Sequence, residues 1–221
     1  MSQRVLSRRA FVLGGAGMGA LALAGCSTAT SRGPTVEEPK VDPAFVRMYA
    51  ALPNERFPIP AVDLRKIDRT YYRQLVDYPT NEQPGTIVVD TRAKYLYLVR
   101  EEGKAMRYGV GIGRAGFSWS GRATIARKQE WPTWTPPAEM IERDPQLEEW
   151  RNGMPPALDN PLGARALYIY QDGVDTLYRL HGTTEVWSIG RAVSSGCVRL
   201  LNQDVIDLYE RVPVNSPIVV V

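Results

Sequence analysis

The chain has 221 residues, a length that fits one catalytic domain with short additions and leaves no room for a second full domain. Hydrophobic residues make up 44% and charged residues 23%, and the mean hydropathy of −0.26 excludes a polytopic membrane protein. The net charge is only +3, and no run of Lys or Arg is interleaved with aromatic residues, so nucleic acid is not expected as a partner.

Residues 1–26 have the features of an export signal. Arginines at positions 4, 8 and 9 precede an uncharged stretch, residues 10–25, that is too short and too weakly apolar for a membrane span. Residues 7–12 (SRRAFV) resemble the twin-arginine export motif. Residues 23–26 (LAGC) resemble a lipobox, which predicts lipidation of Cys26 and anchoring to a membrane. The alternative is an ordinary thiol in a signal that is cleaved elsewhere.

The mature part of the chain divides into three predicted segments. Residues 27–43 are rich in Ser, Thr, Pro and Glu and are expected to form a flexible tether. Residues 44–83 are interrupted by prolines, and we expect an extension that packs on the domain, with one short helix over residues 67–76. Residues 84–221 are expected to form the catalytic domain.

From Gly85 onward the sequence predicts strands. Two runs rich in β-branched and aromatic residues, 86–90 and 95–99, are separated by polar turn residues and indicate a hairpin. Further strands are expected over residues 105–112, 123–128, 166–170, 176–180 and 218–221. Many short strands without alternating long helices predict a mainly β domain of the barrel or sandwich type, with a few short helices.

Two segments late in the chain differ from this pattern. Residues 202–211 carry an apolar stripe, and Asn202 is expected to cap the N-terminus of a helix there. Residues 130–161 contain Trp131, Trp134 and Trp150 among several prolines and are expected to be irregular. This segment is either a packed structural loop or a wall of a substrate cleft, to which Trp134 would contribute.

The chemistry is concentrated near the C-terminal end, at His181 and Cys197. His181 is the single histidine, and with Cys26 assigned to the signal, Cys197 is the remaining thiol. A thiol becomes a strong nucleophile when a histidine in contact takes its proton. Gly196 allows a sharp turn before the cysteine, where successive N–H groups could form an oxyanion hole. Lone Cys and His residues are more often structural, so this pairing alone is a weak signal.

The flanking residues make the signal specific. His181-Gly182-Thr183 is followed, with the cysteine 16 residues after the histidine, by residues 194–200 (SSGCVRL). Together with residues 84–90 (PGTIVVD), 131–136 (WPTWTP) and 160–168 (NPLGARALY), this order of motifs resembles the L,D-transpeptidases with a YkuD-type catalytic domain.

The resemblance implies a role for each matching residue. Cys197 matches the nucleophile, His181 the general base, and the carbonyl of Gly182 the acceptor that orients the imidazole. The N–H groups of Gly196 and Cys197 match the oxyanion site, and Arg199 is expected to face substrate carboxylates. The implied substrates are peptidoglycan peptide stems, whose acyl group would pass through a thioester to an amine. A wall-linked lipoprotein is a further expected partner in some members, and the implied location is the periplasm or cell envelope.

Ser195 departs from the pattern, because many members have a second histidine at that position. It is expected to supply a supporting substrate contact and leaves His181 without a substitute. Zinc is not expected, since one His and one free Cys are too few ligands, and no cofactor is implied. A serine hydrolase built on Ser194 or Ser195 is disfavoured, because neither serine lies in Gly-x-Ser-x-Gly. The open alternatives are hydrolysis at the same Cys-His site, as in an L,D-carboxypeptidase, and a non-catalytic wall-binding lipoprotein.

Overall fold

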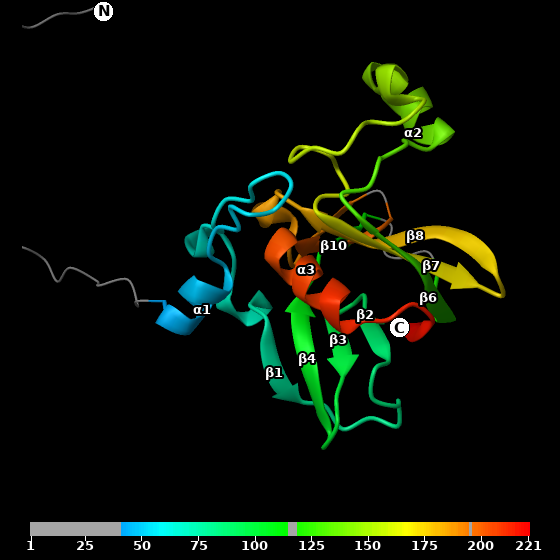
Figure 1. Cartoon of the computed structure of the whole chain (residues 1–221). Coiled ribbons are helices and arrows are strands. Elements are labelled where there is room, and N and C mark those ends of the chain that lie inside the picture. Colours follow the sequence, from blue (N-terminus) through cyan, green and yellow to red (C-terminus); the bar gives the residue numbers. More distant parts are fainter. Residues whose placement is uncertain (1–40, 115–118, 195) are drawn as a thin grey trace, which may run out of the picture. The chain divides into compact units, whose positions relative to one another are not determined.

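The domain is built mainly from β-strands with a few short helices, and this prediction from the sequence is confirmed (Figure 1). The computed structural model describes residues 41–114, 119–194 and 196–221. The strands are β1 (Gln74–Asp77), β2 (Ile87–Asp90), β3 (Tyr95–Val99), β4 (Lys104–Gly109), β5 (Ile112–Gly113), β6 (Gly121–Glu130), β7 (Arg165–Gln171), β8 (Val174–Thr183), β9 (Ala192–Ser194), β10 (Val198–Leu201) and β11 (Ser216–Val220). The helices are α1 (Pro43–Met48), α2 (Ala138–Arg143) and α3 (Asn202–Arg211), with short 3₁₀ turns η1 (Leu64–Lys66), η2 (Arg69–Tyr71), η3 (Pro145–Trp150) and η4 (Val186–Ser188).

Nine of the strands in the described residues form one mixed sheet, in the order β1-β4-β3-β2-β11-β6-β7-β8-β10. β11 lies in its middle, parallel to β2 on one side and antiparallel to β6 on the other. Both β2 and β11 contain nearly continuous apolar runs, as expected of strands that are covered on both faces. β5 and β9 pair separately in a small parallel sheet.

Helix α3 packs against the inner face of β7 and β8 and closes the main core (Figure 1). Val205 and Leu208 are fully buried there, and each such side chain contributes about 1.5–3 kcal/mol to folding. The ammonium group of Lys128 on β6 donates to the carbonyls of Tyr209 at 2.5 Å and Val212 at 2.6 Å. These bonds satisfy carbonyl groups that the end of a helix leaves without partners.

The N-terminal segment, residues 41–83, contacts α3 and the start of β7 through buried polar groups. The Tyr49 hydroxyl donates to Asp204 at 3.2 Å, and the side-chain amide of Gln203 donates to the carbonyls of Ala50 and Pro60. Since each contact joins this segment to the body of the domain, the segment is part of the packed structure.

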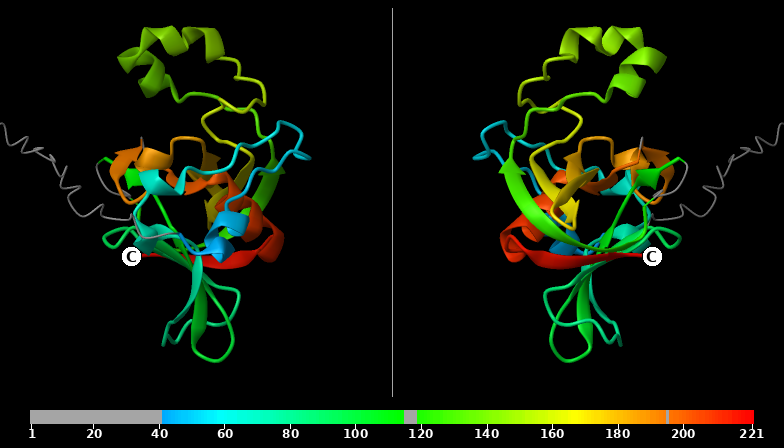
Figure 2. Two further views of the ribbon diagram at one scale, coloured as in Figure 1. Left: turned by 90° about the vertical axis from the view of Figure 1, so that its left-hand side faces the viewer. Right: turned by 90° about the vertical axis from the view of Figure 1, so that its right-hand side faces the viewer.

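Three local expectations are wrong. Residues 67–76 do not form a helix: they contain the short turn η2 and then enter β1, which pairs with β4 at the edge of the sheet. Asn202 does not cap α3, because its side-chain oxygen accepts from the backbone N–H of Ala164 at 3.0 Å instead. Residues 130–161 are not wholly irregular, since they include α2 and η3, which stand clear of the sheet in Figure 2.

Every helix in the part of the chain that the structure describes falls short of the length and hydrophobicity that a membrane span requires. The expected signal, residues 1–26, and most of the expected tether lie outside the described residues.

Candidate active site

The pairing of β8 with β10 brings the histidine and cysteine segments together. The two strands are parallel neighbours, with Arg199 opposite His181 and Val198 opposite Leu180. Val198 and Leu180 are fully buried in the core. Because successive side chains of a strand alternate between faces, His181 and Arg199 lie on the other face. Cys197 directly precedes β10, at the end of the same strand pair.

His181 is held as a neutral imidazole. Its side chain is almost fully buried, and Nδ1 donates to the carbonyl oxygen of Gly182 at 2.8 Å, since a carbonyl can only accept. Burial, helped by the nearby guanidinium groups of Arg199 and Arg179, lowers the pKa of His181 to about 4, and the backbone carbonyls of Gly182 and Pro161 act in the opposite direction. The imidazole is therefore uncharged at neutral pH, with its proton on Nδ1 and Nε2 able to accept one.

The thiol of Cys197 is also neutral in this structure. Burial raises its pKa above the ordinary value, while the backbone N–H of Arg179 and the guanidinium groups of Arg179 and Arg199 act in the opposite direction. Sγ lies 3.9 Å from the carbonyl oxygen of Leu177, a distance at which the thiol is a weak donor. The resting state thus has a neutral thiol and a neutral imidazole rather than a thiolate and an imidazolium.

The turn before the cysteine is fixed by Ser194. Its buried hydroxyl donates to the carbonyl of Cys197 at 2.7 Å and accepts from the N–H of Gly196 at 3.3 Å. Gly196 has a φ of 133°, in the left-handed region that favours glycine, and a Cβ there would lie 3.4 Å from the ring of Tyr178. Sequence reasoning considered Ser194 only as a nucleophile. Its position three residues before the cysteine is typical of a hydroxyl that stabilises a turn.

Two ion pairs lie beside the thiol and the imidazole. The guanidinium of Arg199 forms an ion pair with Glu185 at 2.5 Å. This group was expected to face substrate carboxylates, and it has a partner within the protein. Arg179 makes a two-pronged contact with Asp175, at 2.6 and 2.8 Å, across a bulge in β8. Leu177 lies in this bulge with a φ of 63°, and its carbonyl is turned toward the thiol.

Exposed apolar side chains lie on the segments that carry the site. Leu177 is 74% exposed and Trp187, in η4 between the histidine and the cysteine, is 49% exposed. Sequence reasoning missed both, although the Thr-Thr-Glu-Val-Trp sequence after Gly182 places a large aromatic residue in a short connection.

The other predicted residues lie elsewhere or outside the description. Trp134 is half-buried, and its backbone pairs with Met154 at 3.0 and 2.7 Å in the segment that carries α2. Trp131 is buried, and its ring nitrogen donates to Glu55 at 2.9 Å, as in a packed structural loop. Ser195 and Cys26 lie outside the described residues.

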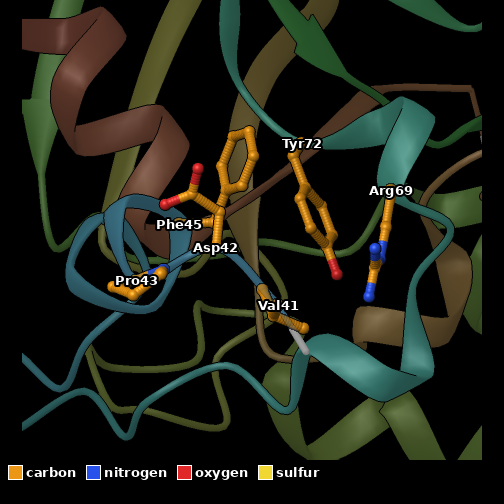
Figure 3. Close-up of a pocket in the computed structure, with 6 residues that line it drawn as sticks. All are labelled: Val41, Asp42, Pro43, Phe45, Arg69 and Tyr72. Atoms are coloured by element: carbon orange, nitrogen blue, oxygen red, sulfur yellow. The ribbon is translucent and has the colours of Figure 1, made fainter. Parts of the chain in front are cut away.

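A hollow of about 400 Å³ lies on the N-terminal segment (Figure 3). Its lining residues come from α1, η2 and their flanks, and none belongs to β8 or β10. They are Val41, Asp42, Pro43, Phe45, Arg69 and Tyr72. This hollow is therefore separate from the strand pair β8–β10. Among residues 41–114, 119–194 and 196–221, no group of three or more His, Cys, Asp or Glu side chains is arranged to hold a metal ion.

Comparison with known proteins gives a consistent family. The model of the L,D-transpeptidase catalytic domain (YkuD) matches residues 84–220. A probable L,D-transpeptidase ErfK/SrfK of Escherichia coli is 34% identical over 157 residues, which are 69% of this chain and 48% of that protein. A probable L,D-transpeptidase YbiS of the same species is also 34% identical, over 62% of this chain and 44% of that protein. The chain thus spans less than half the length of these two relatives.

A solved structure from Brucella melitensis is more similar in sequence. It is 45% identical with a TM-score of 0.50, and the match covers 68% of this chain and 94% of that one. That protein is described as a probable carnitine operon oxidoreductase caia.

Proposed function

The chain belongs to the family of L,D-transpeptidase catalytic domains, and from this premise we propose that it is a peptidoglycan L,D-transpeptidase with Cys197 as nucleophile and His181 as base. The observation that carries the proposal is the β8–β10 pair, which brings the single histidine and the single described thiol to one end of one strand pair. The oxidoreductase name of the Brucella protein does not alter the proposal, because the family model and both E. coli relatives agree.

The proposed reaction begins with proton transfer. The thiol of Cys197 turns from the Leu177 carbonyl, gives its proton to Nε2 of His181, and attacks the carbonyl of diaminopimelate in its bond to D-alanine. When the tetrahedral intermediate collapses, the carbon–nitrogen bond breaks and D-alanine leaves with the proton from the imidazolium. A thioester remains on Cys197. The amine of a second stem attacks it, and the thiol is regenerated as the new amide forms.

The neutral resting pair supports this order of events. An imidazole whose pKa is about 4 is a weak base toward a thiol whose pKa is raised, so the ion pair forms only transiently. The guanidinium groups of Arg179 and Arg199 favour the thiolate and disfavour the imidazolium. The Gly182 carbonyl, which accepts from Nδ1, stabilises the imidazolium while it lasts.

The oxyanion of the intermediate would be stabilised by backbone N–H groups of the cysteine turn. We assign this role to the N–H of Cys197, with the N–H of Gly196 as the second donor. Because the Gly196 N–H also contacts the hydroxyl of Ser194 at 3.3 Å, that second donor must be shared between the hydroxyl and the substrate.

Location and anchoring form a separate part of the proposal. The features of residues 1–26 support export through the twin-arginine route, lipidation at Cys26 and residence in the cell envelope. Cys26→Ala should release the protein from membranes, and an unchanged membrane fraction would contradict the lipid anchor.

The test of the reaction uses purified disaccharide-tetrapeptide stems and mass analysis of the products. The wild-type chain should form cross-linked dimers with loss of D-alanine, and Cys197→Ala and His181→Gln should not. Trimmed tripeptides without dimers would indicate that water is the acceptor, as in a carboxypeptidase. Intact stems, with no carbapenem adduct on Cys197, would refute the catalytic assignment in favour of a wall-binding lipoprotein.

A further inference from the structure

Three side chains form a row across the sheet on the strands next to the thiol. Tyr168 on β7 lies opposite Arg127 of β6 on one side and opposite Arg179 of β8 on the other. Side chains of directly opposed residues lie on the same face of the sheet. The guanidinium carbons of the two arginines lie 4.6 and 4.4 Å from the centre of the Tyr168 ring, which is 8% exposed. The ring is therefore stacked with a cation from each neighbouring strand.

The two arginines differ in how far their charge is neutralised. The guanidinium of Arg179 binds both oxygens of Asp175, at 2.6 and 2.8 Å. Arg127 is exposed, and within the described residues its side chain makes one hydrogen bond, a 3.4 Å contact with Gln129. The planar guanidinium of Arg127 is positioned by the tyrosine ring, yet most of its donors remain available to a ligand.

Arg179, the last side chain of this row, lies on the strand next to the one that Cys197 precedes. The backbone N–H and the guanidinium of Arg179 both act on the thiol of Cys197, and β10 is the next strand after β8. Neighbouring strands are about 4.8 Å apart, so the backbone of Arg127 lies roughly 14 Å from that of Cys197. An extended peptide covers about 3.3–3.6 Å per residue. A substrate with its reacting carbonyl at Cys197 therefore reaches Arg127 within a few residues.

The charge of this face favours an anionic ligand. Arg127, Arg179 and Arg199 carry three positive charges, whereas Asp175 and Glu185 carry two negative ones, and His181 is neutral at its lowered pKa. The unbalanced charge belongs to Arg127. A guanidinium fork matches the two oxygens of a carboxylate.

We propose that Arg127, held against Tyr168, binds a carboxylate of the peptide stem whose carbonyl reacts at Cys197. This inference rests on the proposed function and names a substrate-binding residue for it. Tyr168 positions the guanidinium of Arg127, and Arg179 contacts the same ring from the neighbouring strand β8. The alternative is a packing role, in which the stack stabilises the sheet and no ligand touches Arg127.

The test measures binding separately from turnover. The full chain carrying Cys197→Ala is titrated with a tetrapeptide stem that has free carboxylates and with the same stem in which they are carboxamides. Adding Arg127→Gln should weaken binding of the carboxylate stem about tenfold, the effect of losing one charge-assisted hydrogen bond. Binding of the amidated stem should not change, and Arg127→Lys should restore part of the affinity.

Arg122→Gln is the matched control. Arg122 lies on the same strand, is exposed and pairs with Glu82, away from the row. Arg122→Gln should leave the affinities for the carboxylate stem and the amidated stem unchanged. Equal losses for both stems with Arg127→Gln, no loss for either, or no binding of the stems at all would overturn the proposal.

Measuring turnover then distinguishes failure of the proposed function from failure of the proposed binding site. If the wild-type chain forms no product but its Cys197→Ala variant binds stems in an Arg127-dependent way, the proposed function fails and the binding site stands. If the wild-type chain forms cross-links and Arg127→Gln does not discriminate carboxylate from carboxamide, the binding site fails and the function stands.

Discussion

Asp204, in the first turn of α3, is expected to make the stability of the protein depend on pH. It is fully buried, and Oδ2 accepts from the Tyr49 hydroxyl at 3.2 Å. Oδ1 has no hydrogen-bond partner in the described residues, and Nε of Arg73 is 3.7 Å away. Arg73 is also shared with Asp207, which it contacts at 3.0 Å. Burial therefore outweighs the attraction of Arg73 and raises the pKa of Asp204 to about 7.

The size and sign of the effect follow from the difference between the pKa of Asp204 in the folded state and its pKa in the unfolded state. In the unfolded chain the pKa of Asp204 returns to about 3.8, so the folded state binds the proton more tightly. This tighter proton binding stabilises the folded state. The stabilisation is complete below about pH 4, falls as the pH rises toward 7, and is absent above it. Each tenfold change in proton affinity corresponds to about 1.4 kcal/mol. Raising the pH from about 4 to above 7 should therefore lower the free energy of unfolding by roughly 4 kcal/mol through this carboxyl.

Asp204→Asn removes the titration while retaining the shape of the side chain. Urea unfolding at pH 4.5, 5.5, 6.5 and 7.5 would measure the free energy of unfolding of variant and wild type. The difference, variant minus wild type, should increase steadily with pH, by about 3–4 kcal/mol over this range. Asp207→Asn is the control on the same helix: the pKa of Asp207 is lowered, so its effect is lost only below the range tested. Parallel curves for Asp204→Asn and wild type would refute the reasoning.

Three further predictions concern the site and α3. Ser194→Ala should lower kcat about tenfold, because the turn that carries Cys197 loses two hydrogen bonds; an unchanged rate of thioester formation would contradict this. Acylation of Cys197 by a carbapenem should stay level between pH 5.5 and 7.5 and fall toward pH 4, the pKa of His181, whereas an inflection near pH 6.5 would indicate an ordinary histidine. Lys128→Met should destabilise the protein by about 1–3 kcal/mol in urea unfolding, because two carbonyl groups at the end of α3 lose their donor; an unchanged midpoint would show that water replaces it.

The sequence predicts best those features that depend on local pattern. The runs of β-branched residues that form β2 and β3 are recognisable because both are apolar and end at polar turns. The apolar stripe of residues 202–211 likewise predicts α3 with its correct bounds. Cys197 and His181 are identifiable because each is chemically distinctive and flanked by an ordered motif.

What the sequence could not predict depends on strand register. The Arg127–Tyr168–Arg179 row exists because irregularities at residues 125–127 of β6 and 168–170 of β7 set which residues lie opposite one another. Asn202 was assigned to a helix cap from local preference alone, yet its amide binds Ala164, 38 residues away in the sequence. Residues 67–76 contain a helix-compatible pattern, but pairing with β4 draws their second half into a strand.

The place of β11 in the sheet also bears on when the protein can fold. β11 is the last of the described strands to leave the ribosome, and it joins β2 to β6 and so links the two halves of the sheet. Neither half can complete its backbone pairing at this seam during synthesis of the earlier strands. The nascent chain must therefore wait for residues 216–220 before the histidine and cysteine segments gain their final support. A ribosome stalled before Ser216 should display a chain that proteases cut readily, whereas release of the full chain should make it resistant.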